Sequence, residues 1–158
     1  MDISVVVPLY NEEESLPELF AWIERVMNAN GFSYEVIFVT DGSTDRSWQV
    51  IEQLQAQAPD KVRGIKFRRN YGKSPALFCG FEQAQGAVVI TMDADLQDDV
   101  NAVDGFIDGF CNGNEIVYGV RSARKKDTWF KRTTAEAFYK VFEWMGAETV
   151  PDHADYRL

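Results

Sequence analysis

Cysteine and histidine are scarce in this sequence, and basic residues are fewer than acidic ones. The 158 residues include one histidine and two cysteines, Cys79 and Cys111, which are too few for a disulfide framework. The sequence has 16 lysine and arginine residues and 25 aspartate and glutamate residues, which gives a formal net charge of −9. An acidic chain lacks the basic surface that neutralises phosphates, so its composition argues against nucleic acid as the main partner.

Long hydrophobic runs are absent as well. No window approaches 18 uninterrupted apolar residues, and the first residues lack the basic and apolar regions of a secretory signal. Hydrophobic residues make up 46% of the chain and charged residues 26%, as in an ordinary globular domain. We therefore expect residues 1–158 to form one soluble, cytoplasmic domain.

Short apolar, β-branched runs alternate with stretches of helical periodicity. The runs predict strands over residues 3–8, 34–39, 62–67, 87–92 and 116–119. The periodic stretches predict helices over residues 16–30, around 48–54, and over 74–85, 100–110 and 128–145. This alternation predicts an α/β fold with a Rossmann-like, mostly parallel central sheet and helices on both faces.

The most informative motif is acidic and follows the fourth predicted strand. Residues 93–99 read Asp-Ala-Asp-Leu-Gln-Asp-Asp, with four carboxylates and one amide. Asp93 and Asp95 can face the same side if the strand end bends, and Gln97 can add a neutral oxygen. Such oxygens suit Mg²⁺ or Mn²⁺ bound together with a substrate phosphate. The alternative is an acidic loop that caps the next helix, a role suited to Asp98 and Asp99.

A second polar motif, Asp-Gly-Ser-Thr-Asp over residues 41–45, follows the second predicted strand. Asp41 can accept hydrogen bonds from a ribose or from a base edge. Alternatively, the motif is a turn in which Thr44 or Asp45 caps the next helix. Neither the dinucleotide-binding G-x-G-x-x-G after the first strand nor a P-loop occurs, so both of these site classes are disfavoured.

The basic residues of the middle of the chain fall in two groups, within residues 61–73 and 121–132. They could form two solvated loop surfaces, or two cationic walls around an anion. Arg121 follows the fifth predicted strand, where a guanidinium can hold a phosphate. Ligands of parallel α/β sheets bind at the carboxyl ends of the strands. Since both groups adjoin that edge, a metal-bound anion explains both signs of charge.

Four segments of the chain resemble the signatures of family 2 glycosyltransferases, which have the GT-A fold. They are VVVPLYNEE at residues 5–13, TDGSTD at 40–45, NYGK at 70–73 and DADLQ at 93–97. The resemblance covers nearly the whole chain and is greatest to the branch that transfers a sugar to a polyprenyl phosphate. That branch includes dolichyl-phosphate mannosyltransferase and bacterial undecaprenyl-phosphate glycosyltransferases.

The resemblance implies roles for individual residues. It assigns to the nucleotide-sugar site Pro8, Tyr10, Glu12, Asp41, Lys73, Asp93 and Arg121. It assigns to the metal site Asp93, Asp95 and Gln97. Asp95 and Asp155 are the implied catalytic residues, and Arg157 is implied to contact the acceptor. One departure concerns Thr40, which stands where the family usually has an acid.

The implied activity is an inverting hexosyl transfer from a UDP- or GDP-sugar, with Mg²⁺ or Mn²⁺ on the leaving diphosphate. A polyprenyl phosphate is the expected acceptor. Family members continue beyond the segment that matches Arg157-Leu158 into interfacial and often transmembrane helices. The resemblance therefore implies that residues 1–158 precede the acceptor-binding, membrane-associated part. It also implies that the full-length protein works at the cytoplasmic face of the inner membrane.

Three other functions stay open at this point. The acceptor could be a saccharide hydroxyl in cell-envelope polysaccharide synthesis, for which Asp155 would act as general base. The chain could be a non-catalytic nucleotide-sugar-binding domain. A nucleotidyltransferase is disfavoured because residues 9–14 carry three glutamates where such enzymes place a glycine-rich basic loop.

Overall fold

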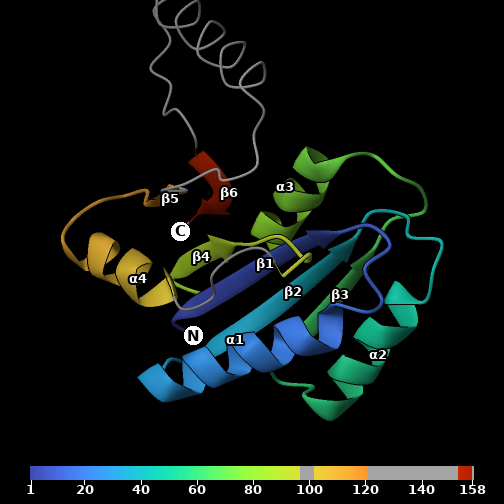
Figure 1. The fold of residues 1–158 in the computed structure, drawn as a ribbon, viewed down its shortest axis with the longest axis horizontal. Coiled ribbons are helices and arrows are strands. Elements are labelled where there is room, and N and C mark those ends of the chain that lie inside the picture. The colour runs from blue at the N-terminus through green and yellow to red at the C-terminus, as the bar shows by residue number, and fades with distance from the viewer. Residues whose placement is uncertain (97–101, 121–152, 158) are drawn as a thin grey trace, which may run out of the picture.

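The computed structural model describes residues 1–96, 102–120 and 153–157, which form one central sheet with helices on both faces (Figure 1). The strands are β1 (Ile3–Leu9), β2 (Tyr34–Thr40), β3 (Val62–Lys66), β4 (Val88–Thr91), β5 (Tyr118–Val120) and β6 (His153–Arg157). The helices are α1 (Leu16–Asn30), α2 (Ser47–Gln57), α3 (Lys73–Gln83) and α4 (Val103–Cys111). The expected helix over 128–145 lies outside the described residues.

The strand order in the sheet is β3-β2-β1-β4-β6-β5. Strands β3, β2, β1 and β4 run parallel, with Val5 of β1 opposite both Val36 of β2 and Ile90 of β4. Strand β6 is antiparallel to both β4 and β5. The predicted mostly parallel sheet, with helices on both faces, is therefore confirmed.

The prediction was incomplete for the part of the sheet that the last strands of the chain, β5 and β6, form. No strand was expected after residue 119, yet β6 inserts between β4 and β5, with Arg157 opposite Thr91. The fifth strand begins two residues later than expected, at Tyr118. The other four strand predictions agree with the structure to within one residue at each end.

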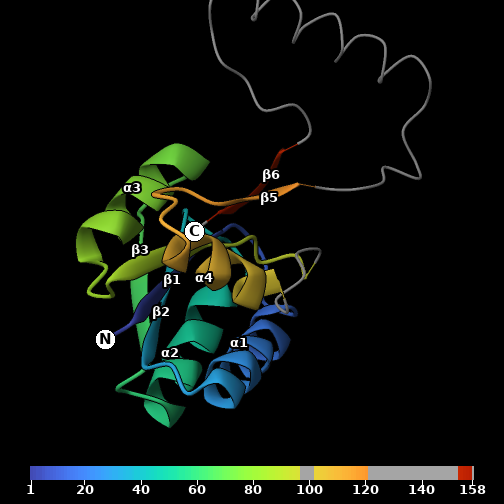
Figure 2. The same cartoon turned by 90° about the vertical axis from the view of Figure 1, so that its left-hand side faces the viewer.

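Side chains alternate between the two faces of β1 and β2, because successive residues of a strand point in opposite directions. Val5, Val7 and Phe38 join the larger core under α1, α2 and α4. Val6 and Ile37 point to the opposite face, where they pack with Ala76 of α3. Figure 2 shows α3 on the side of the sheet opposite α1 and α2. Burial on both faces explains why β1 and β2 read as continuous hydrophobic runs.

Helix α3 lies close to the sheet because it carries a glycine where it crosses β1. A Cβ atom built on Gly80 would stand 2.3 Å from Cγ1 of Val6, closer than any real contact. Ala76, one turn earlier, is fully buried against the same face. These two small residues fix the height of α3 above β1, and with it the position of Lys73 at the start of the helix.

A buried carboxylate holds the amino-terminal end of the sheet together. Glu35 is 1% exposed and accepts hydrogen bonds from the hydroxyl of Ser4 (2.7 Å), the backbone N–H of Gln85 (2.7 Å) and the guanidinium of Arg63 (3.0 Å). Burial alone would raise the pKa of Glu35, but these three donors hold it below its usual value. The network joins β1, β2 and β3 to the segment between α3 and β4.

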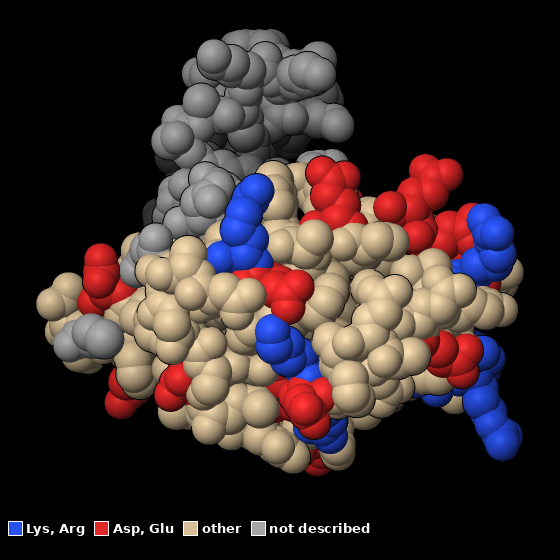
Figure 3. Space-filling model, turned by 90° about the horizontal axis from the view of Figure 1, so that it is seen from below, with Lys and Arg blue, Asp and Glu red and all other residues tan. Residues whose placement is uncertain are grey.

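Charged residues are interspersed on the face that carries α1 and α2 (Figure 3). Basic and acidic side chains lie side by side there, as in the pairs Lys61–Glu24 (2.8 Å) and Arg46–Glu13 (3.2 Å). This face therefore offers no continuous basic surface. None of the helices that the structure describes is long and apolar enough to cross a membrane.

The Glu35 network should make the stability of the fold depend on pH. Because the pKa of Glu35 is lowered in the folded protein, its stabilisation is present above the unfolded-state pKa of about 4.3 and is lost as the pH falls through the folded-state pKa. We expect Glu35→Gln to lower the free energy of unfolding by about 2 kcal/mol at pH 7, with little difference from the wild type in strong acid. Urea unfolding across this pH range measures both.

Glu82→Gln is the control, because Glu82 is exposed and carries the same charge. It should leave stability unchanged at both extremes of pH. A Glu35→Gln protein as stable as this control at pH 7 would contradict the role given to the network.

Candidate functional site

A cavity of about 310 Å³ opens at the carboxyl edge of the parallel strands. Its lining comes from four segments that are far apart in the sequence: the end of β1, the end of β2, the start of α3 and the loop after β4. The lining residues are Pro8, Leu9, Tyr10, Glu12, Asp41, Asn70, Gly72, Lys73, Ala76, Asp93, Ala94 and Asp95. This volume lies at the lower end of the usual range for small-molecule sites, about 300–1,000 Å³.

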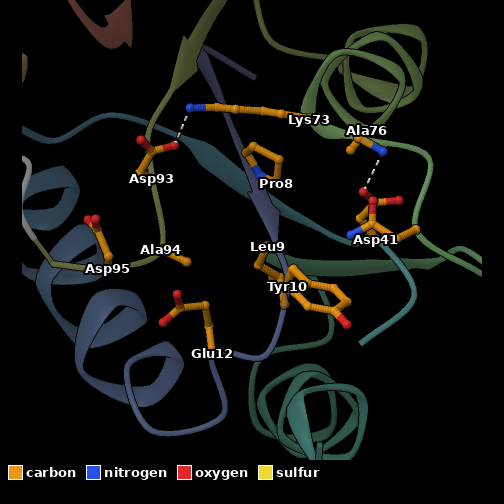
Figure 4. A pocket seen from close by; sticks show the side chains of 12 residues that line it. Pro8, Leu9, Tyr10, Glu12, Asp41, Lys73, Ala76, Asp93, Ala94 and Asp95 are labelled. Carbon is orange, nitrogen blue, oxygen red and sulfur yellow. Dashed lines mark hydrogen bonds and ion pairs between the residues drawn. The ribbon is translucent and has the colours of Figure 1, made fainter. Parts of the chain in front are cut away.

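The cavity has an acidic end and an aromatic end (Figure 4). Glu12, Asp93 and Asp95 gather on one side of it, whereas Tyr10 and Asp41 lie on the other. Tyr10 is 46% exposed, so its ring can stack on a planar ligand group. A ligand that fills the cavity would therefore meet an aromatic ring at one end and carboxylates at the other.

One cation bridges the two sides of the cavity. The side chain of Lys73 extends from the start of α3 past Pro8 to the loop after β4 (Figure 4). Its ammonium group lies 2.7 Å from Oδ1 of Asp93. Two residues further along, Asp95 is exposed and lines the same cavity. Leu96 follows with φ of 58°, in the left-handed region of backbone conformation. Residues other than glycine rarely adopt this region.

The carboxylate of Asp41 binds the loop that leads into α3. One of its oxygens accepts a hydrogen bond from the backbone N–H of Tyr71 and the other from that of Gly72, both at 2.7 Å. Asp41 is 5% exposed, so these donors satisfy a nearly buried charge. Its contacts in this structure therefore position the 70–73 segment, and each oxygen keeps a further lone pair for a ligand.

The loops after β1 and β2 are linked by side-chain hydrogen bonds that sequence reasoning missed. Asn11, with φ of 58°, accepts a hydrogen bond from the backbone N–H of Thr44 at 2.8 Å. In return the backbone N–H of Asn11 donates to Ser43, and that of Glu12 donates to Ser47. The turn-forming residues of both segments are the sequence signal that could have indicated these hydrogen bonds. Their partners lie more than 30 residues away, so the sequence did not show which residues pair.

The motif over residues 41–45 also leads into a helix, although the N-cap residue of α2 is Arg46, whereas the alternative interpretation expected Thr44 or Asp45. Asp45 accepts hydrogen bonds from the backbone N–H of Ser47 (3.0 Å) and from its hydroxyl (2.6 Å), at the beginning of α2. Although its burial acts in the opposite direction, these bonds lower the pKa of Asp45. Thr40 is fully buried, and its hydroxyl lies 2.6 Å from that of Ser43. At this position the family signature usually has an acid. Thr40 carries no charge, and its hydroxyl stabilises the turn instead.

The structure brings six of the seven predicted nucleotide-sugar residues into one cavity. They are Pro8, Tyr10, Glu12, Asp41, Lys73 and Asp93, and Asp95 joins them from the predicted catalytic and metal sets. Gln97 and Arg121 lie outside the described residues, as do Asp98 and Asp99. The assigned roles of all of these residues stay predictions.

Asp155 and Arg157 belong to β6, whose backbone the structure describes. Arg157 is paired with Thr91 at the end of β4, two residues before Asp93. Because β6 runs antiparallel to β4, Asp155 lies further towards the edge where the acidic loop begins. The backbone therefore brings the predicted acceptor segment next to the predicted metal segment.

The residues present fit a divalent cation that also binds a substrate. Within the described residues, no three histidine, cysteine or acidic side chains converge into a complete protein-only metal site. Mg²⁺ is usually held by one or two carboxylates together with substrate phosphates, and Asp93 and Asp95 provide such a pair. Asp93 already binds a positive group, the ammonium of Lys73. A divalent cation that is shared with an anionic ligand is therefore compatible with this donor set.

Comparison with known proteins establishes the family. Residues 4–156 match the sequence model of the family described as "Glycosyl transferase family 2". The chain belongs to this family. Its resemblance to family 2 glycosyltransferases, based on the segments at residues 5–13, 40–45, 70–73 and 93–97, is thereby confirmed.

Two curated relatives align with the whole of this family 2 chain. An uncharacterized glycosyltransferase of Synechocystis is 39% identical over 160 residues, which make up 50% of that protein. A protein of Shigella phage SfV named bactoprenol glucosyl transferase is 36% identical over 159 residues, or 52% of its length. The chain thus spans about half the length of the curated relatives it matches.

Solved structures of low sequence identity share the fold. Mannosyl-3-phosphoglycerate synthase from Rubrobacter xylanophilus superposes on 90% of this family 2 chain with a TM-score of 0.69 at 15% identity, over 48% of its own chain. The mannosyltransferase PcManGT from Pyrobaculum calidifontis, solved in complex with GDP-Man and Mn²⁺, gives 0.54 at 22% identity. That match covers 89% of this chain and 38% of PcManGT. These likenesses confirm the predicted GT-A fold.

The contacts of Asp41 lead to a prediction that needs no ligand. In Asp41→Asn one of the two backbone N–H groups would face an amide NH₂ instead of an acceptor, and leaving such a donor unsatisfied costs about 1–3 kcal/mol. We expect the amides of Tyr71 and Gly72 to exchange their hydrogens faster and the free energy of unfolding to fall by this amount. Hydrogen-exchange mass spectrometry of the ligand-free protein measures the first effect.

Asp60→Asn is the matched control, since Asp60 is exposed in the turn before β3. It should leave the exchange of the 70–73 segment unchanged. If Asp41→Asn behaved like this control, Asp41 would not be holding the loop.

Proposed function

We propose that this chain forms the nucleotide-sugar-binding domain of an inverting hexosyltransferase. In this proposal a UDP- or GDP-sugar is the donor and a polyprenyl phosphate is the acceptor. The observation that carries the proposal is the cavity in which Asp93 and Asp95 share one end and Tyr10 and Asp41 occupy the other. A nucleotide diphosphate has the matching shape, because a planar base is joined through a ribose to two charged phosphates.

The aromatic end suits the nucleoside. The exposed ring of Tyr10 can stack on the base, and Asp41 can accept a hydrogen bond from the base edge through the lone pairs that the backbone does not use. Pro8 lies between this end and the acidic end (Figure 4). In this proposal the diphosphate lies near Lys73 and the carboxylates of Asp93 and Asp95.

An acidic cavity needs added positive charge before it can hold a diphosphate. Lys73 supplies one charge against the carboxylates of Glu12, Asp41, Asp93 and Asp95. Mg²⁺ or Mn²⁺ bound by Asp93 and Asp95 would offset the charge that builds on the diphosphate as the glycosidic bond breaks. PcManGT, which shares the fold, was solved in complex with GDP-Man and Mn²⁺, and this supports a divalent cation here.

The chain's own residues then orient the reaction at the anomeric carbon. Attack of the acceptor from the side opposite the diphosphate forms the new bond as the old one breaks, which inverts the configuration. Asp155, carried by β6 beside the end of β4, is our candidate for the residue on the acceptor side. For a hydroxyl acceptor it would take the proton, an effect worth about 10²–10⁴-fold.

A lipid phosphate is the acceptor we favour. The name of the Shigella phage relative, bactoprenol glucosyl transferase, supports it at 36% identity. The second pKa of a phosphate monoester is about 6, so such an acceptor is mostly ionised at pH 7. It would need positioning, which we assign to Arg157, more than it needs a base. A lipid acceptor would place the reaction at the cytoplasmic face of the membrane.

The metal role predicts how an aspartate variant behaves. Asp95→Ala should keep the fold but abolish the Mn²⁺-dependent part of nucleotide binding, because a single carboxylate remains to hold the cation. Isothermal titration calorimetry with UDP- and GDP-sugars, with and without Mn²⁺, measures this. Asp60→Ala, on the exposed turn, serves as the control and should bind as the wild type does. Equal Mn²⁺ dependence in both variants would refute the metal role.

The acceptor class has a separate test. Because residues 1–158 are expected to precede the acceptor-binding part, the full-length protein is incubated with Mn²⁺, a radiolabelled UDP- or GDP-sugar, and either undecaprenyl phosphate in detergent or a soluble oligosaccharide. The proposal predicts label in the organic phase with the lipid and none on the oligosaccharide. Label on the oligosaccharide alone would show that the acceptor is a saccharide hydroxyl, and nucleotide binding without any transfer would favour a binding domain.

A further inference from the structure

The contact between Lys73 and Asp93 has a consequence for the order in which ligands bind. The two side chains are 39% and 33% exposed, and their charged atoms are 2.7 Å apart. An ion pair as exposed as this is held only weakly against water, so it can be exchanged for another pair. The pair also lies within the cavity, since both residues line it.

The backbone that carries Lys73 is held in place on both sides of this residue. Asp41 binds the N–H groups of Tyr71 and Gly72 just before Lys73. Gly80, two turns into α3, sets the helix against Val6 of β1. A change of partner by the Lys73 ammonium therefore needs no movement of this backbone, and Lys73 lines the cavity in which the new partner would bind.

We propose that Lys73 is the resident counter-ion of Asp93, and that it is exchanged for the divalent cation when a nucleotide diphosphate binds. This inference rests on the proposed function, which places the cation at Asp93 and Asp95. Without nucleotide, the ammonium occupies the carboxylate that a metal needs and so weakens metal binding. With nucleotide, the phosphate oxygens become a new partner for the ammonium and supply further ligands to the metal.

The charges of the cavity support this exchange. Four carboxylates and one ammonium line it, so loss of the Lys73 contact without a replacement cation would remove a positive charge from a cavity that is already acidic. A diphosphate that enters alone would meet the same carboxylates and be repelled. Metal and nucleotide should therefore enhance each other's binding by the same factor, as thermodynamic linkage requires.

The test is the affinity for Mn²⁺ alone, measured from the electron paramagnetic resonance signal of the free ion. Lys73→Met removes the competing ammonium and keeps most of the apolar stem. We expect it to bind Mn²⁺ more tightly than the wild type in the absence of nucleotide, by on the order of tenfold. Added UDP or GDP should then increase its Mn²⁺ affinity by a smaller factor than it does for the wild type.

Two variants control for charge and for the ion pair. Lys66→Met changes the net charge equally, but Lys66 lies over the ring of Trp48, outside the cavity, and this variant should bind Mn²⁺ as the wild type does. Lys73→Arg keeps a cation that can pair with Asp93 and should keep the weak Mn²⁺ binding. Far-ultraviolet circular dichroism confirms that all three variants are folded.

The outcomes separate this inference from the proposed function. If Lys73→Met bound Mn²⁺ no more tightly than Lys66→Met, the exchange would be wrong. The metal site would still stand in that case if nucleotide promoted Mn²⁺ binding in the wild type. If no protein bound Mn²⁺ even with UDP or GDP present, the proposed metal site would fail and the exchange with it.

Discussion

The parallel pairing of β1 with β2 and β4 is the constraint on which the site depends. It brings the ends of three strands to one edge, so that Tyr10, Asp41 and Asp93 line a single cavity although they lie far apart in the chain. Parallel strands require crossover connections, and α1, α2 and α3 provide them on the two faces. The same pairing buries β1 and β2 on both sides, so the hydrophobic core and the site arise from one arrangement.

Polar interactions divide into two sets at opposite ends of this sheet. At the amino-terminal end, Glu35 is buried and its partners are all protein groups. At the carboxyl end, Asp93 is partly exposed and Asp95 is exposed, and both line the cavity. Asp41 combines both kinds of role, because it is nearly buried, satisfied by backbone donors and yet part of the cavity wall. The first set stabilises the fold, and the second is available for a ligand.

The sequence predicted those features that depend on local pattern. The strands 3–8 and 34–39 were evident as apolar runs, and the family segments located the cavity residues. Strand β6 was missed because His153–Arg157 is short and polar, and it becomes a strand only through pairing with β4 and β5. The contacts of Asp41 with Tyr71 and Gly72, and of Asn11 with Thr44, were missed for the same reason. Each joins residues about 30 positions apart, which no local pattern reveals.

The central claim is that Asp93 and Asp95 bind a divalent cation together with a nucleotide diphosphate. Anomalous diffraction from crystals grown with Mn²⁺ and UDP or GDP tests it most directly, because it locates the metal without any assumption about activity. The account predicts one Mn²⁺ peak between these carboxylates and the diphosphate, with the Lys73 ammonium displaced from Asp93. A nucleotide bound elsewhere, or a nucleotide in this cavity with no metal beside Asp93 and Asp95, would contradict it.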